Sequence, residues 1–303
     1  MTITRTDLRA YAMLALVMLF WAGNAIVGRA VRDDIPPFTL ALVRWGGALL
    51  VVAPFALRHV VADRAVLRRA WRRVLLLGLL GIATFNALLY YGLRFTTATN
   101  AMLIQAAIPG LVLLFDYLLF RTRSGWQAIA GVALSTAGVV LIVCRADLQV
   151  LMRLDFGTGD LLILAAVVVW GLYTSLLRTR PAVHPSSFIA VTFAIGALAM
   201  LPPAIGEWRV GGFPPLRADT LAAFTYVAIL PSLVAYFLYN ATVAAIGAGR
   251  AGQAISLMPL FGAFIAASLL DEALRPFHAA GMVLILVGIV TGAVARSENK
   301  QAD

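Results

Sequence analysis

Charge is scarce in this sequence. Only 13% of the 303 residues are charged and 62% are hydrophobic, with a mean hydropathy of +0.92, whereas soluble domains are about 25% charged and about 45–50% apolar. Water is therefore not the main solvent of this chain. A bilayer core about 30 Å thick needs about 20 apolar residues per helix. Ten such helices with short loops nearly use up the length, so we expect no separate soluble domain.

Cysteine, lysine and histidine are almost missing as well. Cys144 is the single cysteine, which excludes an intrachain disulfide and a CxxC metal or redox site. Lys300 is the single lysine and stands in the tail, which excludes a GxxxxGK[ST] phosphate loop and a lysine Schiff base. The three histidines form no HExxH motif. We therefore predict no ATP motor, no metal site and no cofactor.

The formal charge of +10 comes from arginines in short loops between apolar runs. These loops lack the basic stripe with interleaved aromatic residues that is typical of nucleic-acid binding. Positive residues stay on the cytoplasmic side of a membrane, and most of the 24 Lys and Arg residues face one side when the N-terminus is placed inside. We predict a multi-pass protein of a bacterial-type inner membrane with both termini cytoplasmic. The expected partners are the lipid bilayer and a small-molecule solute, and we expect a monomer or a weak homodimer.

Apolar runs follow one another along the whole chain. They occupy residues 10–31, 37–57, 74–94, 98–120, 126–144, 160–178, 186–205, 220–242, 251–270 and 277–295. Each is long enough for one membrane helix. The sequence therefore predicts an all-α integral membrane protein with ten transmembrane helices.

The two halves of the chain repeat at an offset of about 150 residues. Pro109 matches Pro259, and an offset of 149 aligns Trp21 with Trp170. Each half holds five helices, an odd number, so the second copy has to enter the membrane upside down. We predict two inverted five-helix repeats, at residues 1–148 and 149–303.

Loop charges agree with this inversion. The arginine-rich loop 58–73 reads as cytoplasmic, whereas its counterpart 206–219 carries Glu207 and Asp219 and reads as outside. Asp147 and Asp271 are also predicted outside. Inverted repeats are a known architecture of secondary transporters, whose substrate site lies near the bilayer midplane between the halves.

A family resemblance rests on both halves. The stretch RAGQAISLMPLFGAFIAASLLDEALRPFHAAGMVLILVGIV at 250–290 resembles the EamA-type repeat of the drug/metabolite transporter superfamily. The first half adds FWAGNAIVGRAV at 20–31, LVRWGGALLVVAP at 42–54 and ATNAMLIQAAIPG at 98–110. It departs from the pattern at 121–125, where RTRSG stands in place of the acidic pair Asp271 and Glu272. Within the superfamily the chain most resembles the YddG-type exporters of aromatic amino acids.

Aromatic and amide side chains at mid-depth are the candidate substrate-binding residues. Trp21 and Trp170 lie midway along repeat-related helices, too deep for an interfacial aromatic belt. Asn24 and Tyr173 each follow one of these tryptophans by three residues and so share its helix face. Packing between helices is the alternative for all four.

The third and eighth predicted helices, at 74–94 and 220–242, each carry one amide and one phenol, in exchanged positions. Asn86 and Tyr90 correspond to Tyr236 and Asn240 in the second half. Rings can stack on a flat or apolar solute, and amides can bond its polar ends, although both can equally bridge helices in lipid. The predicted substrate-binding residues are Trp21, Asn24, Asn86, Tyr90, Gln105, Trp170, Tyr173, Tyr236, Asn240 and Ser256.

Two charges and two prolines complete the candidate residues. Arg44 is the clearest charge inside an apolar run and Asp116 is the acidic residue well inside one. Intramembrane charges usually mark function. Arg44 could bind a solute carboxylate or, as a structural residue, backbone carbonyls and loop carboxylates. Pro109 and Pro259 each remove a backbone donor, so they predict either hinges or static kinks.

These features together predict a secondary transporter that exports amino acids, among them aromatic ones, and related small metabolites by alternating access. One alternative is an exporter of cationic drugs or other metabolites, which requires an acidic residue at the binding site. Another is a membrane-embedded lipid-modifying enzyme, which requires a nucleophile or an acid and base pair at depth. Asp116 is the single candidate for the first requirement, and no such constellation meets the second. We therefore expect no catalytic residues and no enzyme.

Overall fold

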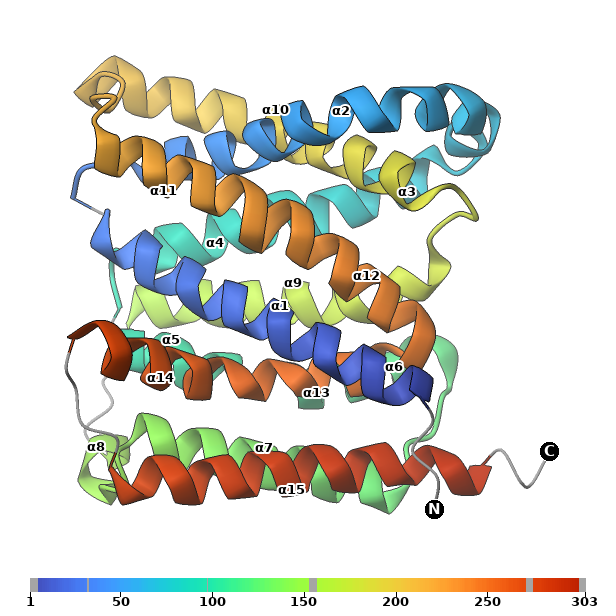
Figure 1. Ribbon diagram of the computed structural model, residues 1–303, viewed down its shortest axis with the longest axis vertical. Helices are drawn as coiled ribbons and strands as arrows, with labels where there is room; N and C mark the ends of the chain where they lie inside the picture. Colours follow the sequence, from blue (N-terminus) through green and yellow to red (C-terminus); the bar gives the residue numbers. More distant parts are fainter. Residues whose placement is uncertain (1–4, 32, 97, 153–156, 271–274, 300–303) are drawn as a thin grey trace.

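The computed structural model describes residues 5–31, 33–96, 98–152, 157–270 and 275–299. Every regular element in these ranges is a helix. The helices run side by side between two opposite ends of the molecule (Figure 1). The all-α prediction therefore holds for the described part of the chain.

Proline places the start of several helices, because its fixed φ suits the first turn and its missing N–H is not needed there. Pro37 begins α2 and Pro185 begins α10. The first half forms α1 (Arg5–Ala30), α2 (Pro37–Arg69), α3 (Trp71–Gly78), the π-helical turn η1 (Leu79–Thr84), α4 (Phe85–Gly92), α5 (Ala98–Gln105), α6 (Ile108–Phe120), α7 (Trp126–Val143) and α8 (Leu148–Met152). The second half forms α9 (Thr158–Leu176), the 3-10 turn η2 (Leu177–Thr179), α10 (Pro185–Gly211), α11 (Ala218–Ala228), the π-helical turn η3 (Ile229–Val234), α12 (Ala235–Ile246), α13 (Ala248–Gln253), the 3-10 turn η4 (Ala254–Leu257), α14 (Met258–Leu270) and α15 (Pro276–Asn299).

Nine helical spans in the described residues are long and apolar enough to cross a membrane. The remaining predicted run, 251–270, forms α13, η4 and α14 in succession. Figure 1 shows that these elements together run from one end of the bundle to the other, beside α1. Nine of the ten expected spans are thus present as such, and the tenth run is helical but interrupted.

Two predicted loops are largely helical. α2 continues to Arg69 and α10 continues to Gly211, so much of the segment 58–73 and the start of 206–219 belong to helices. Arginine and alanine are good helix formers, so a helix continues after its apolar run has ended. A helix as long as α2 measures about 50 Å, more than the bilayer core of about 30 Å. Its charged last third therefore projects beyond the apolar layer.

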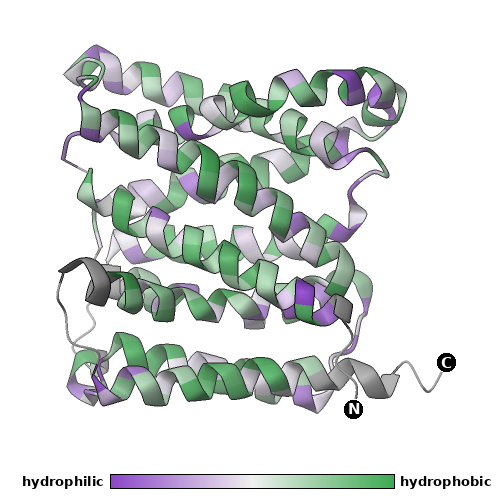
Figure 2. Cartoon of the chain, in the orientation of Figure 1, coloured by the Kyte–Doolittle hydropathy of each residue, from purple (hydrophilic) through white to green (hydrophobic). Residues whose placement is uncertain are grey.

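The surface between the two ends is apolar. Leu50, Phe55 and Leu198 are each about 70% exposed or more. Figure 2 shows hydrophilic residues gathered at the two ends of the bundle and hydrophobic residues along the helices between them. Contiguous exposed apolar surface of this extent fits lipid rather than water.

Elements at equivalent places in the two halves pack in matching pairs. α2 packs along α10, and α7 packs along α15. α4 packs on α9, and in the same way α12 packs on α1. The centre of the bundle is therefore formed by α1, α4, α9 and α12 with the turns η1 and η3.

Small residues permit the closest helix contact. A Cβ on Gly131 would lie 2.5 Å from the Gly288 carbonyl, and a Cβ on Gly288 would lie 2.6 Å from the Gly131 carbonyl. Gly131 of α7 and Gly288 of α15 therefore let the two helix backbones approach each other closely.

The helical path is interrupted at repeat-related positions. η1 begins at Leu79 and η3 at Ile229, which is the offset of 150. Pro109 stands in the first turn of α6, directly after the break that ends α5. Pro259 follows η4 in the first turn of α14. Both prolines thus lie at helix breaks, and their role as hinges remains a prediction.

α1 begins and α15 ends on one side of the bundle, together with the connections α2–α3, α6–α7 and α12–α13 (Figure 1). The connections α1–α2, α4–α5 and α10–α11 lie at the other end. The relative placement agrees with the predicted topology. The terminal residues themselves, and Asp271 and Glu272, lie outside the described residues.

Candidate functional site

Arg44 lies at the centre of a buried hydrogen-bond network. Its side chain projects from α2 and is 3% exposed. Nε donates to Ser232 Oγ at 2.6 Å. Nη1 donates to Asn86 Oδ1 at 3.0 Å and to Tyr90 OH at 2.9 Å, and Nη2 donates to the Pro231 carbonyl at 3.2 Å. Each partner is a neutral acceptor, and no carboxylate of the described residues forms an ion pair with Arg44.

The start of α2 is held by a carboxylate from α10. Glu207 Oε1 accepts from the Phe38 backbone N–H at 3.0 Å, and Oε2 accepts from the Thr39 backbone N–H at 2.7 Å. Trp208 Nε1 donates to Thr39 Oγ1 at 2.9 Å. A negative charge here pairs with the positive end of the helix dipole. The contact therefore fixes the turn from which Arg44 extends inward.

The turn η3 supplies the Pro231 carbonyl and the Ser232 hydroxyl to this region. Pro231 has no N–H, and the Val227 carbonyl four residues earlier accepts instead from Ser232 Oγ at 2.6 Å. The Pro231 carbonyl itself accepts from Arg44 and, at 2.9 Å, from Trp21 Nε1. The Pro231 carbonyl thus binds both the Arg44 guanidinium and the Trp21 indole.

The turn η1 has the equivalent role in the first half. The Gly81 carbonyl accepts from Tyr236 OH at 2.8 Å, and Gly81 corresponds to Pro231 at the offset of 150. A Cβ at Gly81 would meet the Tyr173 ring at 2.4 Å. A glycine is therefore required for the close approach of this ring.

Two amide and phenol pairs form hydrogen bonds between helices, one pair in each half. Tyr90 OH lies 3.2 Å from Asn24 Nδ2 and 3.3 Å from Asn24 Oδ1. Tyr173 OH donates to Asn240 Oδ1 at 3.2 Å. The two pairs occupy equivalent positions with amide and phenol exchanged.

Aromatic rings fill the space between these pairs. Trp21 contacts Trp170 with ring centroids 5.2 Å apart and Tyr239 at 5.1 Å. Tyr236 lies 6.0 Å from Trp21 and 5.3 Å from Trp45. All five side chains are buried. In this structure the rings therefore pack on one another and close the centre of the bundle.

Three predicted site residues lie outside this network. Gln105 donates to the Ala101 carbonyl of its own helix at 3.3 Å. Ser256 stands in η4, and its hydroxyl is buried with no hydrogen-bond partner among the described residues. Asp116 forms an ion pair with Arg178 at 2.8 Å and accepts a hydrogen bond from Ser175. Asp116 is thus committed to a contact between α6 and α9.

Four members of the site were not predicted from the sequence. Pro231 contributes its backbone carbonyl and Ser232 its hydroxyl, both from η3, for which the signal was a proline in the middle of an apolar run. Trp45 lies beside Arg44, whose guanidinium is 4.5 Å from its ring centroid. Tyr239, which is not among the predicted substrate-binding residues, is fully buried in the aromatic cluster.

Comparison with known proteins identifies relatives along almost the whole chain. The model of the EamA-like transporter family matches residues 8–144 and 157–291. An uncharacterized transporter of Archaeoglobus fulgidus is 28% identical over 288 residues, which cover 93% of this chain and 96% of that protein. A probable terminal-alkyne amino-acid exporter of Streptantibioticus cattleyicolor is 26% identical over 290 residues, covering 93% and 92%. A solved crystal structure has a TM-score of 0.72 at 19% identity, covering 95% of this chain and 98% of that one, and thus shares the fold.

Proposed function

The chain belongs to the EamA-like transporter family, and from this premise we propose that it exports amino acids, aromatic ones among them, through the interface of its two halves. The multi-pass membrane character and the transport role follow from the family. The substrate, its direction and the mechanism are the proposal. Its main support is the uncompensated positive charge of Arg44 at the centre of the bundle.

A buried arginine without a carboxylate partner favours an anionic group on the solute. Insertion scales give about 2.5–3.5 kcal/mol as the cost of an arginine at the centre of a membrane helix. The acceptors Asn86, Tyr90 and Ser232 reduce this cost but do not neutralise the charge. The carboxylate of an amino acid would neutralise it, and guanidinium and carboxylate match in bidentate geometry.

The aromatic cluster suits the rest of such a solute. Trp21, Trp170 and Tyr236 present ring faces and edges next to the Arg44 network. An apolar or aromatic side chain could replace the present ring contacts when the cluster opens, since offset and edge-to-face aromatic pairs are favourable. The name of the Streptantibioticus relative, an amino-acid exporter, points to the same solute class.

A cationic solute fits this centre less well. It would face the guanidinium of Arg44, and Asp116 is already paired with Arg178. No carboxylate of the described residues takes part in the central network. A solute with a carboxylate is therefore favoured over a cationic drug.

We propose further that residues 1–148 and 149–303 are inverted repeats with ten membrane crossings in all. The support is the matching of packed pairs, α4 on α9 with α12 on α1, and the offset of 150 between η1 and η3. The exchanged pairs Asn24–Tyr90 and Tyr173–Asn240 agree with it. Such halves can exchange conformations and open a midplane site to either side.

Alternating access requires contacts at both ends that can break. At the end where the chain begins, Arg250 pairs with Asp7 at 3.0 Å. At the opposite end Thr96 donates to Asp160, and Arg217 pairs with Asp34 at 2.9 Å. The helix breaks before Pro109 and Pro259 lie where α6 and α14 could tilt.

Counterflow into proteoliposomes tests the solute class. Vesicles with purified protein are loaded with unlabelled phenylalanine, and uptake of labelled phenylalanine is followed in the presence of competitors. Phenylalanine and tryptophan should compete, while phenethylamine, which lacks only the carboxylate, should not. Counterflow of labelled phenethylamine in the same vesicles, with none of phenylalanine, would reject the amino-acid proposal in favour of a cationic solute.

A further inference from the structure

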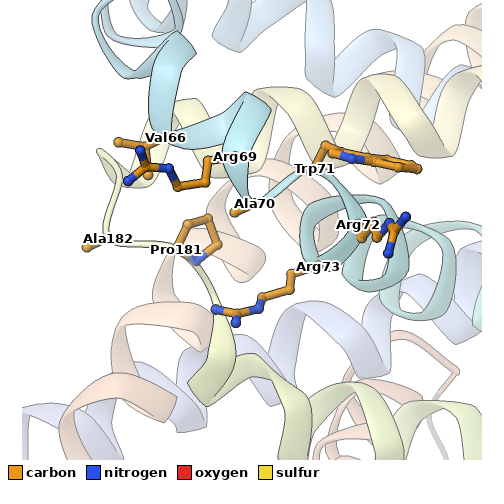
Figure 3. A pocket seen from close by; sticks show the side chains of 8 residues that line it. All are labelled: Val66, Arg69, Ala70, Trp71, Arg72, Arg73, Pro181 and Ala182. Atoms are coloured by element: carbon orange, nitrogen blue, oxygen red, sulfur yellow. The ribbon is translucent and has the colours of Figure 1, made fainter.

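Arginine side chains gather far from the aromatic cluster, at the end of the bundle where α1 begins. A cavity of about 610 Å³ opens between the end of α2, the start of α3 and the segment 181–182 (Figure 3). Figure 3 shows three arginine side chains around the opening. The lining residues that matter here are Val66, Arg69, Trp71, Arg72, Arg73 and Pro181.

The positive charge of this cavity has no internal counterpart. Arg69, Arg72 and Arg73 form no ion pair or hydrogen bond with another side chain in the part of the chain that the structure describes. Asp63 is the single acidic residue of segment 58–73. Its carboxylate accepts from the His184 backbone N–H at 2.9 Å and so holds the start of α10. Three guanidinium groups around one opening therefore lack an anion.

The cavity adjoins the lipid-facing surface. Trp71 is 54% exposed, with the Arg72 guanidinium 5.5 Å from its ring centroid. Leu75 and Leu76, on the next turn of α3, are also exposed. Tryptophan with arginine at this level is typical of the membrane interface. The cavity thus combines a charged pocket with an apolar strip that leads away from it along α3.

We propose that this cavity binds the phosphate of an anionic phospholipid headgroup, with the acyl chains lying along Leu75 and Leu76. Clustered arginines next to a membrane helix attract anionic lipid, each contributing about 1 kcal/mol, and guanidinium binds phosphate in bidentate fashion. A dissolved phosphate would use the charges but not the apolar strip. The site is independent of solute transport.

Native mass spectrometry of the detergent-purified protein tests the assignment. The probes are phosphatidylglycerol and phosphatidylcholine with identical acyl chains, and glycerol 3-phosphate as a soluble competitor. The wild type should retain phosphatidylglycerol at least about tenfold more tightly than phosphatidylcholine, a ratio that corresponds to about 1.4 kcal/mol. The double variant Arg72→Gln/Arg73→Gln should weaken phosphatidylglycerol binding about 30-fold, a factor of about five for each arginine.

Two matched variants keep the result decisive. Arg121→Gln/Arg123→Gln removes the same charge at the same end of the bundle but outside the cavity, and should leave binding unchanged. Arg72→Lys/Arg73→Lys should keep the preference for the anionic lipid and shows that the positions tolerate substitution. If Arg121→Gln/Arg123→Gln weakened phosphatidylglycerol binding as much as Arg72→Gln/Arg73→Gln, net charge alone would explain the binding and the proposed site would be overturned. Displacement of lipid by millimolar glycerol 3-phosphate, or no preference over phosphatidylcholine, would overturn the lipid assignment.

Discussion

Trp21 and Trp170 meet edge to face at the centre of the bundle, with ring centroids 5.2 Å apart and an interplanar angle of 86°. Each tryptophan stands at the equivalent place of its own half, on α1 and α9. Contact between equivalent residues is expected where a pseudo-two-fold axis passes. If the two halves are inverted repeats, as proposed, the pair marks the line along which they part to let a solute pass.

Shortening Trp21 should impair transport far more than shortening an interfacial tryptophan. Trp21→Ala removes a ring that packs on Trp170 and Tyr239 and a hydrogen bond to Pro231. We expect counterflow to fall by about tenfold or more, equivalent to about 1.4 kcal/mol. Trp71→Ala, at an exposed position, should stay within about twofold. Trp21→Phe keeps an aromatic ring at this position and serves as the control for folding. Equal losses of counterflow in Trp21→Ala and Trp71→Ala would contradict a central role of Trp21.

The topology can be tested with single cysteines in a Cys144→Ala background. The substitutions are Arg68→Cys, in the last turn of α2, and Asp147→Cys, between α7 and α8, at opposite ends of the bundle. An impermeant thiol reagent on intact cells should label position 147 and spare position 68, and permeabilised cells should label both. Labelling at position 68 alone would place the arginine-rich end outside and remove the charge argument for the orientation.

Ser232 should contribute to stability through two bonds. Its hydroxyl accepts from Arg44 and donates to the Val227 carbonyl, so Ser232→Ala leaves both groups buried without this partner. An unsatisfied buried group costs about 1–3 kcal/mol, which predicts a clear drop in thermal stability in detergent. Thr291→Val is the control, because the Thr291 hydroxyl bonds only the Val287 carbonyl of its own helix. Equal melting temperatures for Ser232→Ala and the control would show that η3 does not depend on this serine.

The contact of α7 with α15 predicts a contrast between two glycines. Gly288→Ala places a methyl group 2.4 Å from Ser135 Oγ and 2.6 Å from the Gly131 carbonyl, so the helices have to separate. We expect destabilisation by about 1–3 kcal/mol from overpacking. Gly46→Ala, with nothing within 4 Å of the new Cβ, should be neutral or stabilising by up to about 1 kcal/mol. Thermal unfolding of both variants tests this contrast. An unchanged melting temperature for Gly288→Ala would argue against a close contact between α7 and α15.

Energy coupling is predicted to be independent of protons. Proton-driven carriers need a residue in the pathway that binds and releases a proton, and Asp116 is held by Arg178 and Ser175 instead. Solute-driven counterflow should therefore persist without a pH difference, and Asp116→Asn should leave it largely intact. An absolute requirement for a proton gradient that disappears in Asp116→Asn would identify Asp116 as the coupling residue.

Much of the fold could be predicted because local sequence controls it. Apolar length identifies helices directly, and nine of the ten runs appear as membrane spans. The lengths of α2 and α10 were underestimated, since helix propensity continues where hydrophobicity stops. Helix faces predicted an amide and a phenol side by side on each of two helices, whereas the structure forms its amide–phenol hydrogen bonds between helices, as Asn24–Tyr90 and Tyr173–Asn240.

The rest of the site depends on contacts that no local pattern encodes. Arg44 reaches Pro231 and Ser232 across 187 and 188 residues of sequence. Because every residue has a backbone carbonyl, the residue type does not show which carbonyl will act as an acceptor. Glu207 was predicted as a loop acid and instead binds the start of α2, because α10 carries it past its apolar run to that helix end. Tyr239 and Tyr91 look alike in sequence, yet Tyr239 is buried and Tyr91 is exposed.

The central claim is that Arg44 binds the carboxylate of the solute, and the most direct test is the ratio of phenylalanine to phenethylamine affinity in the wild type and in Arg44→Met. A charge-assisted hydrogen bond contributes about 1.5–3 kcal/mol, so the wild type should prefer phenylalanine by about 10- to 150-fold, and the variant should bind both equally. Thermal stability of Arg44→Met is measured alongside to confirm folding. A folded Arg44→Met variant that keeps the full preference for phenylalanine would contradict the account.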